Sequence, residues 1–198
     1  MNRGQAHTME AVAASLILLG GLVFALQSTV VTPLTDSTAS QHVENQLSAE
    51  AEGLLEAAAE DGSLKETTLY WNNSGECFHD AEVCGSYGYT DGGPPTSFGE
   101  SLNETFRDRN VAFNVNVMYL SQGGAISSEE MVRSGHPSDH AVTVRQTVTL
   151  TDDDRLIDRD GEKKDLQLED ADGFYAPNRA VNDSVYNVVQ VEVVLWRM

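Results

Sequence analysis

The sequence predicts an α+β protein: an N-terminal transmembrane helix and a second amphipathic helix, followed by a mainly antiparallel sheet domain with one inserted helix. Two observations predict the helices. Residues 11–31 form an uncharged apolar run, and apolar residues then recur at helical spacing as far as Asp61. A third predicts the sheet, because apolar and polar residues alternate in later segments. The expected regions are a short cytoplasmic segment at 1–10, a transmembrane helix at 11–31, an amphipathic helix at 32–62 and an extracellular α+β domain at 63–198.

The apolar run from Ala11 to Val31 has 21 residues. As a helix it would be about 31 Å long, close to the hydrocarbon thickness of a bilayer. A cleaved secretory signal is the alternative, but its apolar core is shorter, about 7–15 residues, and ends at a small-x-small site that is not clear here. Arg3 precedes the run, and positive charge tends to stay cytoplasmic. We therefore expect a single-pass protein of the cell membrane whose C-terminal domain lies outside.

The rest of the chain is strongly acidic. The net charge is −19, with 31 acidic residues against 12 basic ones. This balance argues against binding to nucleic acid or to an anionic membrane surface. A densely acidic surface suits very high salt, where the screening length falls to a few ångströms. The alternative is an acidic surface that binds cations or a basic partner.

Proline predicts a break or bend at Thr32–Pro33, because it lacks the N–H that an α-helix needs and restricts the residue before it. A second helix is then expected from about Thr38 to Asp61, with Gly62 as its stop. Its apolar face consists of Val43, Leu47, Ala51, Leu54 and Ala58.

The outer domain reads as strands around one short helix. Strands are expected at Glu66–Asn72, Val111–Leu120, Ala141–Asp152 and Ser184–Arg197, with 129–135 pairing to Val111–Leu120. Residues 73–95 read as loop or irregular hairpin. The helix is expected to start at Ser97 as N-cap and to bury Phe98, Leu102 and Phe106. Residues 152–172 form a polar, acidic insertion.

Cys77 and Cys84 are the two cysteines of the chain. In one loop outside a cell, such a pair most simply forms a disulfide. The rival interpretation is a metal site made by Cys77, His79, Asp80 and Cys84, although structural zinc sites use a tighter first pair and a second pair elsewhere. We expect the disulfide, and neither a metal nor a cofactor.

The acidic insertion suggests calcium, but its spacing does not fit an EF-hand. An EF-hand loop has glycine at its sixth position and an oxygen ligand at its first. Counting back from Gly161 or Gly173 places Leu156 or Leu168 at the first position. We expect a solvated acidic loop, with an irregular cation site as the alternative.

A hydrolase hypothesis rests on His136, Asp139 and His140, with Ser138 between them. No nucleophile elbow of the G-x-S-x-G type accompanies them, and Pro137, Ser138 and Asp139 suit a tight turn before a strand. Phosphate-binding and dinucleotide-binding glycine motifs are also missing from the sequence. We therefore expect a turn here, no catalytic residue and no enzyme.

Three Asn-x-Ser/Thr sequons are possible glycosylation sites in an outer domain: Asn72, Asn103 and Asn182. In a chain this rich in Asn, Ser and Thr, one or two would arise by chance.

The opening stretch RGQAHTMEAVAASLILLGGLVFAL resembles the class III signal and N-terminal helix of archaeal type IV pilin-like proteins. The match consists of Arg3-Gly4, then Gln5, then Glu10 and the apolar helix. With its acidic, lysine-poor domain, the chain resembles uncharacterised haloarchaeal pilin-like or flagellin-like membrane proteins. The signal resemblance covers about the first thirty residues.

This resemblance implies that a prepilin peptidase cuts between Gly4 and Gln5, so that the apolar helix survives in the mature chain. Glu10 would then neutralise the amino terminus of a neighbouring subunit during assembly. It would be the sixth residue of the mature chain, one position beyond the usual fifth, and the basic region before the cut is a single arginine. The implied partners are membrane lipid, the peptidase and other pilin-like subunits.

We therefore expect a pilin-like, membrane-anchored surface protein with a structural, assembly or interaction role. The alternative is an unprocessed single-pass anchor that carries an extracellular binding module for a cation, a glycan or an envelope protein.

Overall fold

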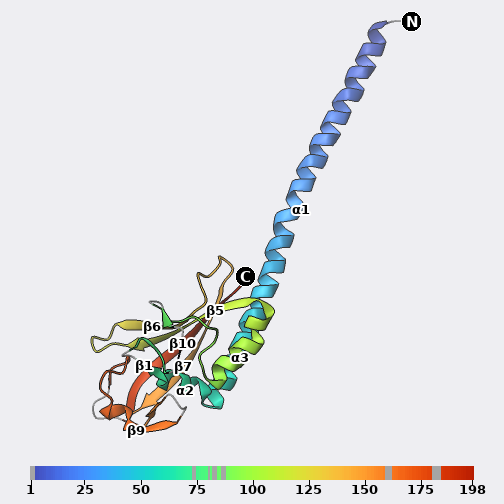
Figure 1. The fold of residues 1–198 in the computed structure, drawn as a ribbon. Helices are drawn as coiled ribbons and strands as arrows, with labels where there is room; N and C mark the ends of the chain where they lie inside the picture. The colour runs from blue at the N-terminus through green and yellow to red at the C-terminus, as the bar shows by residue number, and fades with distance from the viewer. Residues whose placement is uncertain are drawn as a thin grey trace. The chain divides into compact units, whose positions relative to one another are not determined.

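The computed structural model describes residues 3–72, 75–79, 81, 84–85, 88–158, 162–179 and 184–198, without the side chains of 3–6, 26–40 and 85. The chain divides into two compact units, Met1–Val43 and Glu44–Met198. Figure 1 shows the helices and strands of both. The fold is α+β, as predicted, with an N-terminal apolar helix, further helices and a mixed, mostly antiparallel sheet.

Helix α1 (Arg3–Glu60) is one continuous helix of 58 residues. The predicted break at Thr32–Pro33 is therefore wrong, and the helices expected at 11–31 and 32–62 are a single element. Proline removes one i→i−4 hydrogen bond, but its fixed φ is itself helical, so a long helix can continue on the remaining bonds. The segment expected at 1–10 is also helical from Arg3 onward.

The last turns of α1 belong to the second unit and form part of its core. The predicted apolar face is confirmed at Leu47, Ala51 and Ala58, which are buried. Leu55 is also buried, while Leu54 is half-buried. The buried face therefore includes Leu55 in place of the predicted Leu54. The spacing of the buried residues keeps them on one side of the helix.

The main sheet has six strands in the order β3-β4-β6-β5-β10-β7. Its long strands are β5 (Val111–Leu120), β6 (Ile126–Arg133), β7 (Val142–Thr151) and β10 (Val185–Arg197). All pairs are antiparallel except the parallel pair β4–β6. Two short strands, β3 (Cys84–Gly85) and β4 (Gly88–Tyr89), complete one edge. The predicted strands at Val111–Leu120, Ala141–Asp152 and Ser184–Arg197 are confirmed, as is the pairing of β6 with β5.

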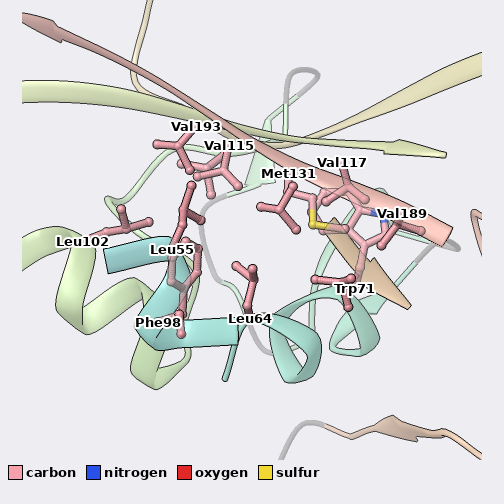
Figure 2. Packing of buried hydrophobic residues seen from close by; sticks show 14 of the residues in the cluster. Leu55, Leu64, Trp71, Phe98, Leu102, Val115, Val117, Met131, Val189 and Val193 are labelled. Carbon is pink, nitrogen blue, oxygen red and sulfur yellow. The ribbon is translucent and has the colours of Figure 1, made fainter. Parts of the chain in front are cut away.

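One face of this sheet carries the hydrophobic core. Figure 2 shows Val115, Val117, Val189 and Val193 on the strands, facing the helical residues Leu55, Leu64, Phe98 and Leu102. All eight side chains are at most 2% exposed. Because successive side chains of a strand point to opposite faces, the intervening residues lie on the other, outer face of the sheet.

The strand predicted at Glu66–Asn72 is wrong over most of its length. Helix α2 (Ser63–Leu69) occupies it, and strand β1 (Trp71–Asn72) pairs with β2 (Cys77–Phe78). Thr67 is β-branched, which disfavours a helix slightly, but its hydroxyl donates to Ser63 O at 2.9 Å, an i−4 bond that a helix supplies. Gly62 precedes α2 with φ of 86°, a conformation that suits glycine.

Helix α3 (Ser97–Thr105) confirms the predicted inserted helix and its buried residues Phe98, Leu102 and Phe106. Its N-cap is Thr96 rather than Ser97, and the Thr96 hydroxyl accepts from Gly99 N. Any Cβ at Gly99 would lie 1.7 Å from Pro94 O, so this position requires glycine. A short 3₁₀ helix, η1 (Arg107–Arg109), leads into β5.

The acidic insertion is a hairpin rather than only a loop. Strands β8 (Arg155–Ile157) and β9 (Lys163–Gln167) pair antiparallel and precede the 3₁₀ helix η2 (Leu168–Asp170). Ile157 and Leu168 are buried, and Lys65 Nζ lies 2.7 Å from Asp154 Oδ2. The insertion is thus held to the rest of the domain by apolar anchors and an ion pair.

Candidate functional site

The most distinctive chemical feature of the chain is the apolar segment of α1. His7–Ala25 is 19 residues long, has a mean hydropathy of 1.9 and buries none of its surface within the chain. Large apolar side chains such as Leu18 and Phe24 are each 74% exposed. A helix that is apolar on all sides needs an apolar environment. Its length and composition are those of a membrane anchor or a signal sequence.

Glu10 lies near the start of this segment. Its Oε2 is 3.8 Å from Nδ1 of His7, one turn earlier in the helix, and both side chains are more than four-fifths exposed. Within the part of the chain that the structure describes, His7 is the basic side chain that lies within 4.0 Å of Glu10. The Glu10 carboxylate is therefore open to a second cationic group from outside the chain.

The predicted processing pair, Gly4 and Gln5, lies in the first turns of α1. The backbone of both residues is helical, and the side chain of Gln5 is outside the described residues.

Further along, the apolar segment is built for close contact with hydrocarbon or helices. The Ser15 hydroxyl donates to the backbone oxygens of Ala11 and Val12, so it needs no water partner. At Gly20 and Gly21 an added Cβ would meet no other atom within 4 Å. These glycines leave a shallow, open surface on the helix.

Cys77 and Cys84 are paired in a disulfide, and their Cα atoms are 6.1 Å apart. Their sulfurs are therefore not available as thiolate ligands. His79 is held by a different contact, since its carbonyl accepts from Tyr70 Oη at 2.7 Å. Asp80 lies outside the described residues. Among the described residues, no three His, Cys, Asp or Glu side chains gather as they would around a metal ion.

The residues of the hydrolase hypothesis lie in the loop between β6 and β7, and they contact different groups. His140 Nδ1 lies 2.9 Å from Glu44 Oε1 on α1, whereas His136 Nε2 lies 3.5 Å from Arg133 Nη2. Asp139 is exposed. The two histidines are not assembled with Asp139 into a triad.

The same loop forms the predicted turn, which is closed by a hydrogen bond from Ala141 N to Ser138 O at 3.0 Å. Asn114, buried on β5, fixes the start of the loop. Its Oδ1 accepts from Ser134 N at 2.8 Å, and its Nδ2 donates to Gly135 O at 3.0 Å. These hydrogen bonds fix the shape of the loop. Sequence reasoning missed Asn114 because it reads as one polar residue in an alternating strand.

The described sequons are not freely exposed. Asn72 is half-buried on β1, and Asn103 is half-buried on α3 with its Oδ1 accepting from Gly93 N at 2.9 Å. Asn182 lies outside the described residues.

Sequence reasoning also missed Glu129, which comes from β6 and lies on the core side of the sheet, in register with Val117. Burial and the nearby charge of Glu76 raise the pKa of the Glu129 carboxyl. In the same region, Tyr119 and Tyr175 have ring centroids 5.5 Å apart, and the Tyr175 hydroxyl is buried. Burial likewise raises the pKa of Tyr175. Strand register places Glu129 and Tyr119 on the same side of the sheet.

No curated protein and no solved structure matches the chain significantly. A protein-family model, described as a family of unknown function (DUF7288), matches residues 3–195. The match includes the apolar segment and nearly the whole sheet domain together. The chain therefore belongs to the DUF7288 family, whose function is unknown.

Proposed function

We propose that this protein is a pilin-like, membrane-anchored surface protein with a structural or assembly role, and that it is not an enzyme. The observation that carries the proposal is α1. One uninterrupted helix supplies an apolar segment exposed on all sides and, from Leu47 to Ala58, part of the core of the sheet domain. Anchor and domain thus share one element, as a subunit held through its N-terminal helix requires.

The exposed apolar segment sets the energetic requirement. Apolar surface in water costs about 25 cal/mol per Å², so this helix must lie in lipid or against other helices. Either environment satisfies the segment, because its backbone groups are bonded within the helix. A filament core made of such helices would therefore accept the segment directly from the membrane.

Glu10 is the residue through which we propose that assembly is aligned. A carboxylate entering an apolar bundle is costly unless a cation meets it. If the chain is cut before Gln5, the new amino terminus of a neighbouring copy supplies that cation. Pairing of Glu10 with this amine would set the register between subunits.

The domain is proposed to lie outside the cell. The Cys77–Cys84 disulfide suits an oxidising compartment, and Arg3 precedes the apolar segment as the positive-inside tendency requires. The partners would then be membrane lipid, a prepilin peptidase and other pilin-like subunits.

One observation favours the alternative function, an unprocessed anchor carrying a binding module. Nδ1 of His7 lies 3.8 Å from Oε2 of Glu10, so Glu10 has a partner in the same chain even if the chain is not processed. In that case Glu10 would remain at the membrane surface with His7, and the outer domain alone would carry the function.

A shearing experiment separates these functions. Cells producing the full chain are sheared, and the sheared filaments are pelleted and probed for the protein. We expect the wild type and Glu56→Gln in the pellet, and Glu10→Gln only in the membrane. Glu56 is the matched control, since it is an exposed glutamate on the same helix. A wild-type chain that never leaves the membrane would contradict the proposal, as would normal filament yield from Glu10→Gln.

A further inference from the structure

The outer face of the main sheet carries an uncharged patch. Strand register places Met118, Gln190 and Thr147 side by side on β5, β10 and β7. Leu120 and Ile126 are paired on β5 and β6, and Val188 follows on β10. The uncharged patch is defined here as Met118, Leu120, Ile126, Thr147, Val188 and Gln190. These residues line a shallow pocket of about 200 Å³.

The apolar members of this patch are open to solvent. Ile126 is 74% exposed, Val188 45% and Leu120 38%. A contiguous exposed apolar surface on a sheet face marks an interaction site more often than a scattered exposed leucine does. Two members of the patch, Thr147 and Gln190, are polar, so the patch combines apolar and polar groups as protein interfaces do.

The residues next to the patch on the same face are charged, but their charges sum to zero. Arg145 Nε donates to Glu192 Oε2 at 2.7 Å, and Asn116 Nδ2 donates to Glu192 Oε1 at 3.1 Å. Beside them, Arg133 Nη1 lies 3.0 Å from Glu130 Oε2. Two carboxylates therefore face two guanidinium groups, and their charges cancel. This neutrality stands out in a chain whose net charge is −19.

We propose that the uncharged patch is a homotypic contact, on which the sheet domain of a second copy of this chain docks. The charge balance of this face favours such an occupant, because the face is neutral while the chain as a whole carries a net charge of −19. Two copies that meet through acidic surfaces repel each other, whereas two copies that meet through this neutral face bury no unpaired charge. A basic partner would instead be drawn to the acidic surfaces elsewhere.

The geometry of the face suits self-association. Two sheets pack face to face about 10 Å apart through alternating side chains, and a two-fold contact uses the same patch on both subunits. The exposed Ile126 of each copy would enter the pocket of the other. At the border of the contact, Arg145 of each copy would remain paired with its own Glu192.

This contact involves the sheet domain and not the apolar helix, so it does not depend on processing or on Glu10. It goes beyond the proposed function, because either an assembled pilin-like subunit or an unprocessed anchor could use it. It predicts that the chain forms pairs in the membrane even when filaments fail to form.

The test uses the full chain in its native membranes with Thr149→Cys, an exposed position beside the patch. The two native cysteines are paired in the disulfide, so a short bismaleimide would react with the new thiol. We expect a cross-linked dimer. Adding Thr147→Glu should lower its yield at least about fivefold by burying like charges. Adding Thr143→Glu, an exposed threonine of the same strand outside the patch, should leave the yield unchanged.

Equal yields from the two glutamate variants, or no dimer at all, would overturn the proposal. If no dimer forms and a lipid-soluble quencher reduces the fluorescence of a fluorophore attached at Thr149→Cys, the patch contacts lipid instead. The measurement is repeated with Glu10→Gln. A dimer that persists there while filaments are lost separates this contact from the proposed assembly role.

Discussion

Arg109 holds Glu50 in a two-point ion pair that ties η1, at the start of β5, to α1. Nη2 of Arg109 contacts Oε2 of Glu50, and Nη1 lies 3.4 Å from Oε1. These hydrogen bonds hold the pKa of the Glu50 carboxyl below its usual range and raise the pKa of the Arg109 guanidinium. The pair lies within the second unit, where it fixes the last turns of α1 to the sheet domain.

Glu50→Gln should weaken the domain modestly. Both side chains are partly exposed, so solvent screening limits the loss to about 0.5–1 kcal/mol. Because the folded pKa of Glu50 is lowered, its contribution is present above the unfolded pKa and is lost as the pH falls through the folded pKa. Denaturant unfolding of the solubilised full chain should therefore show a smaller acid dependence in the variant. Equal stability of variant and wild type from acid to neutral pH would contradict this role.

Glu129→Gln should have the opposite pH behaviour. Burial raises the pKa of Glu129, so its contribution is fully present below the unfolded pKa and is lost as the pH rises through the folded pKa. The uncharged amide removes the cost of burying the carboxylate. We expect Glu129→Gln to raise the thermal midpoint near pH 8 more than near pH 4, two values that lie on either side of the ordinary carboxyl pKa at about 4.3.

Fluorescence of Trp71 and Trp196, the two tryptophans of the chain, reports this unfolding, since both are buried in the domain. Glu130→Gln is the comparison on the same strand. Glu130 is paired with Arg133 on the outer face, so its loss should not stabilise the domain. A lower midpoint for Glu129→Gln at neutral pH would show that the carboxylate has a stabilising partner.

Leu55→Ala should be strongly destabilising. Leu55 is 2% exposed and faces the sheet valines in the core (Figure 2). Removing such a side chain leaves a cavity and costs about 2–5 kcal/mol. Leu54→Ala, at a half-buried neighbour, should cost less. If both variants unfold at the same denaturant concentration, the last turns of α1 are not part of the cooperative core.

His140→Ala should leave assembly intact. The change removes the contact of His140 with Glu44, which is an exposed pair worth about 0–1 kcal/mol. The turn is retained, because Asn114 and the hydrogen bond from Ala141 N to Ser138 O hold the loop. The shearing assay should give wild-type yield. A specific loss of some measured hydrolytic activity with the fold preserved would instead revive a catalytic role for His140.

Periodicity was sufficient to predict the long strands and the buried face of α3, because burial of one side of an element leaves a direct trace in the sequence. The local signals at Pro33 and Thr67 were misleading for a physical reason. Proline costs one hydrogen bond but keeps a helical φ, and a threonine hydroxyl can bond to the i−4 carbonyl. Both residues are therefore compatible with a helix that neighbouring turns support.

The site features divide in the same way. The apolar run and Glu10 could be recognised from sequence, because length and charge are local properties. The uncharged patch could not be recognised from sequence. Its residues, Ile126 and Thr147 among them, come from four strands, and only the strand register brings them to one face. Glu129 was missed for the same reason.

Entry of this protein into the pilin pathway is tested most directly by the mass of its mature N-terminal peptide, measured from native membranes with and without the prepilin peptidase. We expect a chain that begins at Gln5 only when the peptidase is present, which would place the exposed apolar helix in the pilin pathway. A chain that still carries Arg3 in both membranes would contradict it. In that case α1 would be a plain anchor, and the function would lie in the acidic sheet domain.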